Sequence, residues 1–146
     1  WAEGVGEVLT PIEPPAPWYL LVVPQVAVST AAVFQDPTLT RSCRALTISG
    51  FLSGDHAVNV CEEVVRRRFP EVAEALDWLG VRASARMSGT GSSVFAAFDT
   101  RDAADEVRAQ LPATWRGFVC LGLNRSPLLE RVAAHSAGRA VHSGLR

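Results

Sequence analysis

A glycine-rich segment, Met87-Ser88-Gly89-Thr90-Gly91-Ser92-Ser93, is the first candidate for chemistry. Two glycines separated by one residue let the backbone turn through positive φ values and expose successive N–H groups. Such a nest, flanked by hydroxyl side chains, suits a phosphate or another anion. A hairpin turn without a ligand has the same composition, and on the pattern alone that interpretation is favoured. The segment lacks the lysine of a Walker A loop and the third glycine of a dinucleotide fingerprint.

Thr30 and Phe34 form the second candidate, because residues four apart lie on one face of a helix. A hydroxyl and an aromatic ring on a short helix could hold a polar group and a ring of a ligand. By residue type alone, Phe34 is more simply a core residue.

The third candidate lies near the start of an expected helix, where Asp55, His56 and Asn59 occur together. His56 could be a general base, but no nucleophile is paired with it in the sequence, so a surface position is the simpler interpretation. The run Arg66-Arg67-Arg68 could bind phosphate. Three adjacent residues cannot all face one way on a helix, so the run is interpreted as a solvated face.

The cysteines give no sign of a metal site or of a disulfide framework. Cys43, Cys61 and Cys120 are odd in number and far apart, without a C-x-x-C pair, and no histidine stands near them at ligand spacing. We interpret them as small apolar fillers in a reducing, cytoplasmic protein.

The composition is that of one domain without a nucleic-acid or membrane partner. The 146 residues are 48% hydrophobic and 20% charged, and 14 Lys+Arg against 15 Asp+Glu give a net charge of -1. A nucleic-acid binder would show a basic excess, and a membrane span needs about 20 apolar residues in a row. The first residue is Trp and the first stretch does not look like a signal peptide, so we expect a piece of a longer protein.

The elements that must position these candidates follow from the apolar periodicity. Strands are expected at 18–23, 83–88, 93–99 and 115–123, and helices at 29–34, 55–69, 70–80 and 101–111. Ser29 or Thr30 is expected to N-cap the first helix, and Thr100 the last. This order predicts an α+β fold of the split β-α-β (ferredoxin-like) type, with a four-stranded antiparallel sheet and helices on one face. The proline-rich residues 1–16 are expected to be a remnant and connector, residues 17–129 the domain, and residues 130–146 a loose tail.

Several local details are predicted as well. The strand at 18–23 is apolar on both faces, as is typical of a central strand. Val58, Cys61 and Val65 form the apolar stripe of the second helix. Gly80 is expected to cap the third helix, and Ser49-Gly50 and Ser53-Gly54 are expected to form turns.

Short motifs also occur in an order that resembles one enzyme family. In chain order they are Trp1-Ala2-x-Gly4-x-Gly6, Pro17-Trp18-Tyr19-Leu20, Phe34-x-Asp36-Pro37-x-Leu39-Thr40-Arg41, Arg66-Arg67-Arg68-Phe69-Pro70-Glu71-Val72, Arg86-Met87-Ser88-Gly89-Thr90-Gly91 and Asn124-Arg125-Ser126-Pro127-Leu128. Each motif is short, but together they resemble the C-terminal part of the 4-diphosphocytidyl-2-C-methyl-D-erythritol kinases. These enzymes belong to the GHMP kinase superfamily, and the resemblance extends to Leu128 or Leu129.

The resemblance implies a two-lobed kinase of non-mevalonate isoprenoid biosynthesis. The family transfers the γ-phosphoryl group of ATP to the tertiary 2-hydroxyl of a cytidine-diphosphate-linked methylerythritol. ATP with Mg is held mainly by the N-terminal lobe, which also carries the catalytic Asp and Lys. We therefore expect this chain to be the C-terminal lobe, with the missing N-terminal lobe as its partner. No catalytic residue and no metal ligand is expected in the chain itself, and the fragment alone is expected to be inactive.

The resemblance also implies roles for the first two candidates. Phe34 occupies the position of an aromatic that stacks on the cytosine ring, and Thr30 that of a hydroxyl near the methylerythritol. Gly89, Thr90, Gly91 and Ser92 match a glycine motif that packs against the phosphate site. These roles replace the simpler interpretations of Phe34 and of the loop.

One stretch departs from the family pattern. Where the family has Gly-Asn-Asp-x-Glu-Pro, residues 57–63 place Val60 at the Asp and Glu63 at the Pro. Two alternatives therefore stay open beside the kinase lobe: a stand-alone module that binds a small ligand, and an inactive remnant of the fold. The coding sequence upstream of Trp1 would discriminate between them.

Overall fold

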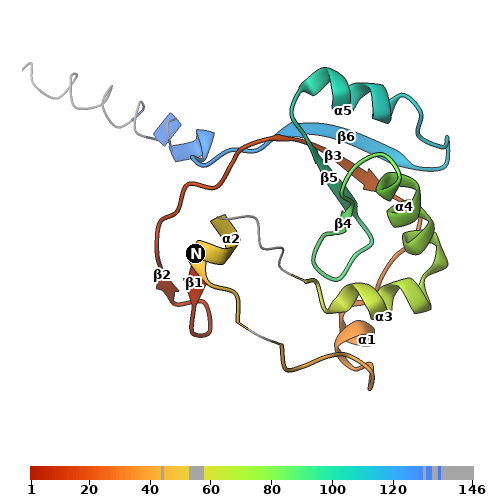
Figure 1. Ribbon diagram of the computed structural model, residues 1–146, viewed down its shortest axis with the longest axis horizontal. Coiled ribbons are helices and arrows are strands. Elements are labelled where there is room, and N and C mark those ends of the chain that lie inside the picture. The colour runs from red at the N-terminus through yellow and green to blue at the C-terminus, as the bar shows by residue number, and fades with distance from the viewer. Residues whose placement is uncertain (44, 53–57, 130, 133–134, 136–146) are drawn as a thin grey trace, which may run out of the picture.

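The computed structural model describes residues 1–43, 45–52, 58–129, 131–132 and 135 (Figure 1). Its centre is a four-stranded sheet of β3 (Trp18–Val23), β4 (Arg86–Met87), β5 (Val94–Phe98) and β6 (Arg116–Leu121). The strand order is β4-β5-β3-β6, and each neighbouring pair is antiparallel. In the register, Leu20 lies between Ala96 and Val119. The predicted α+β fold with a split β-α-β order is therefore confirmed.

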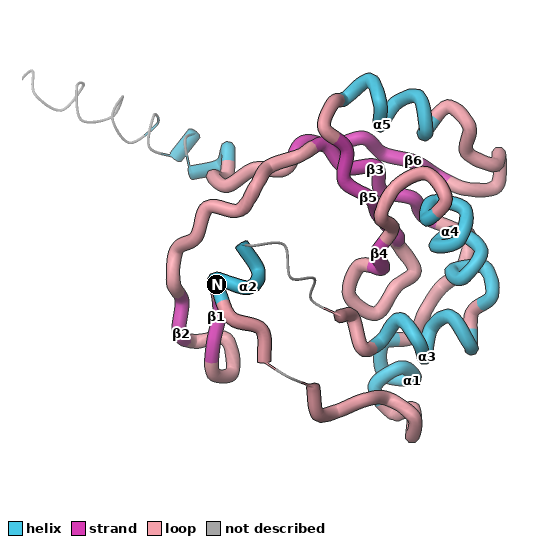
Figure 2. Tube along the Cα trace, viewed as in Figure 1, coloured by secondary structure: helices cyan, strands magenta, loops and turns pink. Residues whose placement is uncertain are grey.

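Among the described residues, five labelled helices accompany the sheet, and residues 127–129 and 131–132 after β6 are also helical (Figure 2). The labelled helices are α1 (Thr30–Phe34), α2 (Ile48–Leu52), α3 (Cys61–Arg68), α4 (Pro70–Gly80) and α5 (Arg101–Arg108). α5 contacts β3, β5 and β6, α4 contacts β5, and α3 packs on α4 and on α1. A separate hairpin of β1 (Ala2–Glu3) and β2 (Val8–Leu9) stands at the start of the chain, apart from the main sheet.

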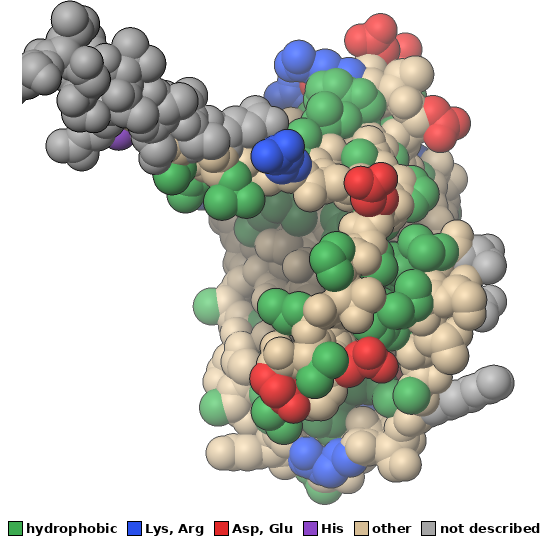
Figure 3. Space-filling model, turned by 90° about the vertical axis from the view of Figure 1, so that its left-hand side faces the viewer, with side chains coloured by type: hydrophobic (Ala, Val, Ile, Leu, Met, Phe, Trp, Pro, Cys, Tyr) green, Lys and Arg blue, Asp and Glu red, His purple; other side chains and the backbone are tan. Residues whose placement is uncertain are grey.

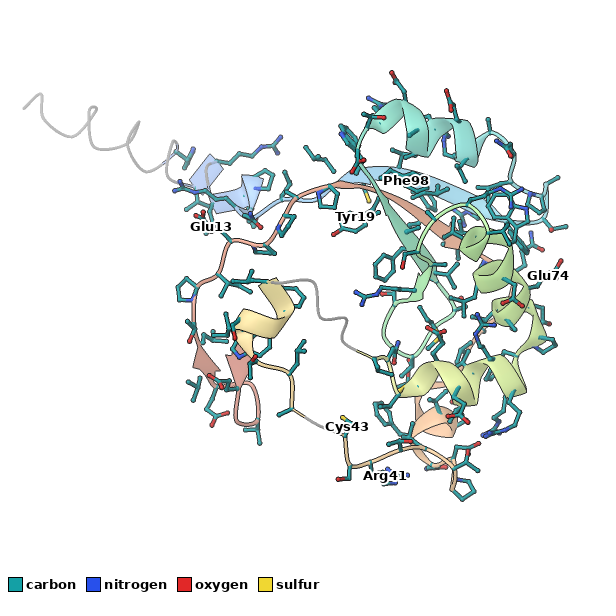
Figure 4. The ribbon with its side chains drawn as sticks, in the orientation of Figure 1. Glu13, Tyr19, Arg41, Cys43, Glu74 and Phe98 are labelled. Atoms are coloured by element: carbon teal, nitrogen blue, oxygen red, sulfur yellow. The ribbon has the colours of Figure 1, made fainter. Side chains whose placement is uncertain are left out.

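The core lies between the sheet and the helices. Leu20 and Val22 of β3 and Val94 of β5 are fully buried against Val72, Leu76 and Leu79 of α4 and the rest of the apolar cluster. Tyr19, on the same strand as Leu20, lies on the side of the sheet away from α5 and is half-buried (Figure 4). The expectation that this segment is a central strand is confirmed, since β3 lies between β5 and β6.

Side-chain caps explain where two helices begin. The Ser29 hydroxyl accepts a hydrogen bond from the Ala32 N–H at 3.3 Å at the start of α1. The Thr100 hydroxyl accepts one from the Ala103 N–H at 3.2 Å at the start of α5. Each supplies an acceptor to an N–H that has no partner within the helix.

Three local predictions are corrected. Helix α3 begins at Cys61, six residues after the predicted 55, and Val58 is 83% exposed instead of contributing to the buried stripe. Gly80 is the last residue of α4, and Val81 occupies the cap. Ser49 and Gly50 lie within α2 instead of a turn. Residues 53–57, which include the other predicted turn, lie outside the described residues.

The connector before β3 is hydrogen-bonded to the segment that follows β6. The side chain of Asn124 donates from Nδ2 to the carbonyl of Pro14 at 2.8 Å, and the Gly122 N–H donates to the carbonyl of Pro17 at 2.9 Å. These contacts attach residues 14–17 to the segment that follows β6. Most of the predicted tail, residues 130–146, lies outside the described residues.

The surface facing the viewer in Figure 3 carries scattered hydrophobic side chains with single charged groups between them. Among the described residues, Cys43 and Cys120 are exposed, so only Cys61 has the buried position expected of an apolar filler. None of the helices in the described ranges combines the length and the apolar character that a bilayer crossing requires.

Candidate functional site

The structure brings together two of the predicted site segments. Thr30, the first residue of α1, and Thr90, in the loop between β4 and β5, place their Oγ1 atoms 2.8 Å apart. One hydroxyl donates to the other, so the start of the helix and the tip of the loop share a hydrogen bond. This contact joins a predicted substrate-side residue to the predicted phosphate-side loop.

Phe34 ends the same helix and is 51% exposed. Its neighbour Val33 is fully buried and anchors the helix to the core. The guanidinium of Arg41, labelled in Figure 4, donates from Nη2 to the Phe34 carbonyl at 2.6 Å. Phe34 is therefore a surface aromatic whose backbone is anchored by Val33 and Arg41. A core phenylalanine would instead have a buried ring. No contact joins the Phe34 ring to the loop among the described residues.

The glycine loop has the backbone that its sequence predicts. Gly89 has φ +54° and Gly91 has φ +86°, both in the region that side chains disfavour. The Ser88 N–H donates to the Ser93 carbonyl, and the Gly91 N–H to the Ser88 carbonyl, both at 2.9 Å. At Gly91 a Cβ atom would lie 3.3 Å from Met87 Sδ and 3.6 Å from Val65 Cγ1. Gly91 is thus required by its φ and by the close approach of the core.

Asn59, just before α3, holds this loop from the other side. Its Nδ2 donates to the carbonyl of Gly89 at 2.7 Å and to that of Met87 at 3.1 Å. Its Oδ1 accepts from the N–H of Cys61 at 3.1 Å. The sequence analysis named Asn59 beside His56 and compared its segment, residues 57–63, with the family pattern, but it did not predict this role. An Asn two residues before a helix with acidic residues in its first turn was the available signal.

Asp36, just after α1, is a second anchor that the sequence analysis missed. Its side chain is 8% exposed and accepts hydrogen bonds from the Thr38 hydroxyl at 2.6 Å and from the Thr38 N–H at 2.9 Å. Arg67 and Arg68 lie 3.1 Å and 3.3 Å from its two oxygens. The Thr38 hydrogen bonds, with the positive charges of Arg67 and Arg68, lower the pKa of Asp36 from 3.8 to about 2.

The arginine run is therefore not simply a solvated helix face. Arg68 also donates from Nη1 to the carbonyl of Ala32 at 3.1 Å, which ties α3 to α1. Arg66 points elsewhere and pairs with Glu62 at 3.3 Å and with Asp77 at 2.7 Å. The three side chains do not all face one way, as expected, but Arg67 and Arg68 converge on Asp36 and brace the site helix, while Arg66 pairs with Glu62 and Asp77.

A hollow of about 740 Å³ lies next to the site rather than in it. Its lining includes Asn59, Glu63, Arg86, Met87 and Phe95, and none of the six predicted site residues. Asp55 and His56, the rest of the third candidate, lie outside the described residues. Within the described part of the chain, no three His, Cys, Asp or Glu side chains gather as a metal site would need.

Two comparisons of the sequence with known proteins both match kinases. A family model described as GHMP kinases C terminal matches residues 38–117. The chain is 56% identical over 130 residues to a 4-diphosphocytidyl-2-C-methyl-D-erythritol kinase of Nitrosococcus oceani, covering 89% of this chain and 46% of that protein. It is 50% identical over 133 residues to the kinase of the same name from Shewanella denitrificans, covering 91% and 46%.

The fold is similar to that of a solved structure as well. A crystal structure of 4-(cytidine 5'-diphospho)-2C-methyl-D-erythritol kinase superposes with a TM-score of 0.69 at 26% sequence identity. The similarity covers 82% of this chain and 48% of that one. The chain thus spans about half the length of the curated relatives it matches.

Proposed function

The chain belongs to the GHMP kinases, since the family model matches residues 38–117 of its 146, and on that basis we propose that it is the substrate-side lobe of an ATP-dependent kinase. The substrate is 4-diphosphocytidyl-2-C-methyl-D-erythritol, whose 2-hydroxyl receives the phosphoryl group in non-mevalonate isoprenoid biosynthesis. The partner of this lobe is the N-terminal kinase lobe of the family. The names of the relatives support the proposal.

The observation that carries the proposal is the exposed Phe34 on a helix whose first residue is bonded to the glycine loop. A solvent-accessible aromatic ring can stack on a nucleobase, because every base has a π-face. Four residues back, Thr30 presents a hydroxyl on the same side of the helix. The loop with Gly89 and Gly91 lies directly beyond it. This order supports assigning the ring to the base, the hydroxyl to the methylerythritol and the loop to the phosphoryl group that ATP transfers to it.

Each group has a binding task in this proposal. Phe34 stacks on cytosine, and Thr30 orients the methylerythritol end toward the loop. Gly89, Thr90, Gly91 and Ser92 present N–H and hydroxyl donors to phosphate oxygens, which accept such hydrogen bonds readily. ATP, bound mainly by the other lobe, supplies the phosphoryl group. Positioning and charge stabilisation account for most of the catalysis in such transfers, and this lobe contributes positioning.

The donor set of the loop fits a phosphate group. Three of its N–H groups, those of Gly89, Thr90 and Ser92, have no hydrogen-bond acceptor among the described residues. In this proposal magnesium accompanies ATP, which is bound mainly by the other lobe, since Mg²⁺ is usually held by one or two carboxylates together with the phosphates of the nucleotide.

The experiment is an activity assay on a chimera that supplies the second lobe. Residues 1–146 replace the matching part of the Nitrosococcus oceani relative, and transfer from ATP is followed with the cytidine-diphosphate substrate. We expect turnover with this substrate and at least tenfold less with its uridine counterpart. A folded chimera that binds ATP but transfers no phosphoryl group would contradict the proposal and favour an inactive remnant.

A further inference from the structure

The side chain of Asn59 contacts three backbone groups at once. It donates to the carbonyls of Met87 and Gly89 at 3.1 Å and 2.7 Å, and it accepts from the Cys61 N–H at 3.1 Å. An amide has an acceptor end and a donor end, and only one orientation places the NH2 at two carbonyls and the oxygen at an N–H. Asn59 is half-buried, so these bonds are partly shielded from water.

The three bonds connect two elements that are far apart in the sequence. Asn59 stands at the start of α3, where its own carbonyl also accepts from the Glu62 N–H at 3.0 Å. Met87 and Gly89 flank the first residue of the glycine loop, 28 and 30 residues further along the chain. The first turn of α3 and the loop are therefore held in a fixed relation through one side chain.

The hydrogen bonds of Asn59 affect which backbone groups of the loop have partners. Successive carbonyls of Met87, Ser88 and Gly89 are all occupied, two by Asn59 and one by the N–H of Gly91 at 2.9 Å. By contrast, the N–H groups of Gly89, Thr90 and Ser92 meet no acceptor in the described residues. A free carbonyl oxygen repels an anion and a free N–H attracts one. Asn59 thus engages the part of the loop that would oppose anion binding.

We propose that Asn59 is a positioning residue that holds the β4–β5 loop in its anion-binding conformation. It does not touch the ligand. It engages the carbonyls of Met87 and Gly89 so that the free N–H groups of the loop face the phosphate. This inference rests on the proposed function in one respect, namely that the ligand at the loop is a phosphate.

The decisive variant is Asn59→Asp in residues 1–146. The carboxylate keeps an oxygen for the Cys61 N–H but replaces the donor with an oxygen that repels both carbonyls, so the helix start survives while the loop is released. Asn124→Asp is the matched control, because Asn124 also donates from Nδ2 to one carbonyl, that of Pro14, outside the loop. Asn59→Ala, which removes both interactions, tests whether the helix start matters in addition.

Two measurements decide the outcome. Hydrogen exchange at the Ser88 and Gly91 amides, which are bonded within the loop, is expected to be at least tenfold faster in Asn59→Asp and unchanged in Asn124→Asp. Nitrogen-15 NMR titration with inorganic tripolyphosphate is expected to shift the Gly89, Thr90 and Ser92 amides of the wild type and of Asn124→Asp. In Asn59→Asp the affinity is expected to be at least tenfold weaker.

Unchanged exchange in the loop of Asn59→Asp would overturn the inference, as would unaltered tripolyphosphate affinity in a loosened loop. Absence of any shift in the wild type would also overturn it. Turnover by the wild-type chimera is measured in parallel. If that chimera is inactive, the proposed kinase function fails, whereas the exchange and titration results still decide the role of Asn59.

Discussion

The hydroxyl oxygens of Thr30 and Thr90 lie 2.8 Å apart, although 60 residues separate them along the chain. Thr30 begins the helix that ends at Phe34, and Thr90 stands between the two positive-φ glycines of the loop. A single hydrogen bond thus couples the predicted base-binding helix to the predicted phosphate-binding loop.

A double-mutant cycle with Thr30→Val and Thr90→Val tests this coupling. Valine keeps the branched shape and removes the hydroxyl, so each single variant loses the same bond. Because the bond is near the surface, we expect a coupling energy of about 0.5 kcal/mol, at the lower end for a protein hydrogen bond. Urea unfolding of the four proteins measures it. Strictly additive effects of the two substitutions would contradict the coupling.

Phe34→Ala is expected to weaken binding of the cytidine substrate without unfolding the protein. Stacking of a base on an aromatic side chain contributes about 1–3 kcal/mol, and this is the loss expected in substrate affinity. ATP affinity is expected to stay nearly constant, since the ring contacts only the cytidine. Calorimetric titration of the chimera with each ligand gives the two affinities.

Thermal unfolding separates this role from a core role. Truncating a buried Phe costs about 3–5 kcal/mol, whereas Phe34 is 51% exposed and its loss is expected to change the melting temperature little. Val33→Ala is the matched control, because Val33 is adjacent and fully buried. It is expected to lower stability clearly while leaving the ring in place. A large stability loss in Phe34→Ala with unaltered substrate affinity would show that Phe34 acts as a core residue and not in substrate binding.

Replacement of Gly91 by Ala or Val is expected to destabilise the loop more than replacement of Gly89. Both glycines have positive φ, for which a side chain costs about 1–3 kcal/mol. At Gly89 a Cβ would meet nothing within 4 Å, whereas at Gly91 it would lie 3.3 Å from Met87 Sδ. The difference in unfolding free energy between Gly91→Ala and Gly89→Ala therefore isolates the packing contribution from the backbone strain.

Gly80→Ala is expected to change the unfolding free energy in the opposite direction. Gly80 is helical, without a positive φ, and a Cβ there would meet nothing within 4 Å. Alanine favours the helix over glycine by up to about 1 kcal/mol, so this variant is expected to be stabilised. If Gly91→Ala matched Gly80→Ala in unfolding free energy, the proposed requirement for glycine in the loop would be wrong.

Asp36 is expected to make stability depend on pH in the acid range. Its pKa in the folded chain is about 2, below the ordinary value of 3.8, so the folded state holds the carboxylate ionised more strongly than the unfolded state. The resulting stabilisation is fully present above about pH 4 and is lost as the pH falls through about 2. Urea unfolding at stepped pH measures the slope in this window.

Two variants assign that slope to its cause. Asp36→Asn removes the titrating group and is expected to flatten its part of the profile. Thr38→Val removes the hydroxyl that contributes most to the lowered pKa, so an intermediate slope is expected. Comparison between variants cancels the other carboxylates of the chain. Equal slopes in wild type and Asp36→Asn between pH 4 and 2 would show that this cluster does not contribute.

Residues 1–146 alone are expected to show no ATP-dependent phosphorylation of the cytidine substrate. The family resemblance places the ATP loop and the catalytic residues in the other lobe, and phosphoryl transfer depends on positioning by both. A radiometric assay with labelled ATP, run beside the chimera and a blank without enzyme, measures this. Turnover by the isolated chain above the blank would disprove it.

The local features of the site could be read from the sequence. A continuous apolar run predicted the strand at Trp18–Val23, and hydroxyl caps predicted the helices that begin at Thr30 and Arg101. The spacing of Thr30 and Phe34 and the pair of glycines at 89 and 91 were visible in the same way. Each of these signals depends on backbone geometry within a few residues, which the chain specifies locally.

The contacts that assemble the site could not be read in this way. Asn59 reaches the carbonyls of Met87 and Gly89, and Asp36 receives Arg67 and Arg68 from a different helix. The sequence analysis therefore interpreted the arginines as solvated and did not predict the contacts of Asn59 and Asp36. Partners separated by 28 to 32 residues leave no periodic trace in the sequence.

The sequence by itself determined the secondary-structure order, the glycines that turn the loop and the resemblance to one kinase family. The tertiary structure alone decided that Phe34 is exposed while the adjacent Val33 is fully buried. The physical reason is that burial depends on which elements pack on a face, and packing is settled by the whole fold. The same fold places the hydroxyl of Thr90 against that of Thr30 and thereby sets the helix beside the loop.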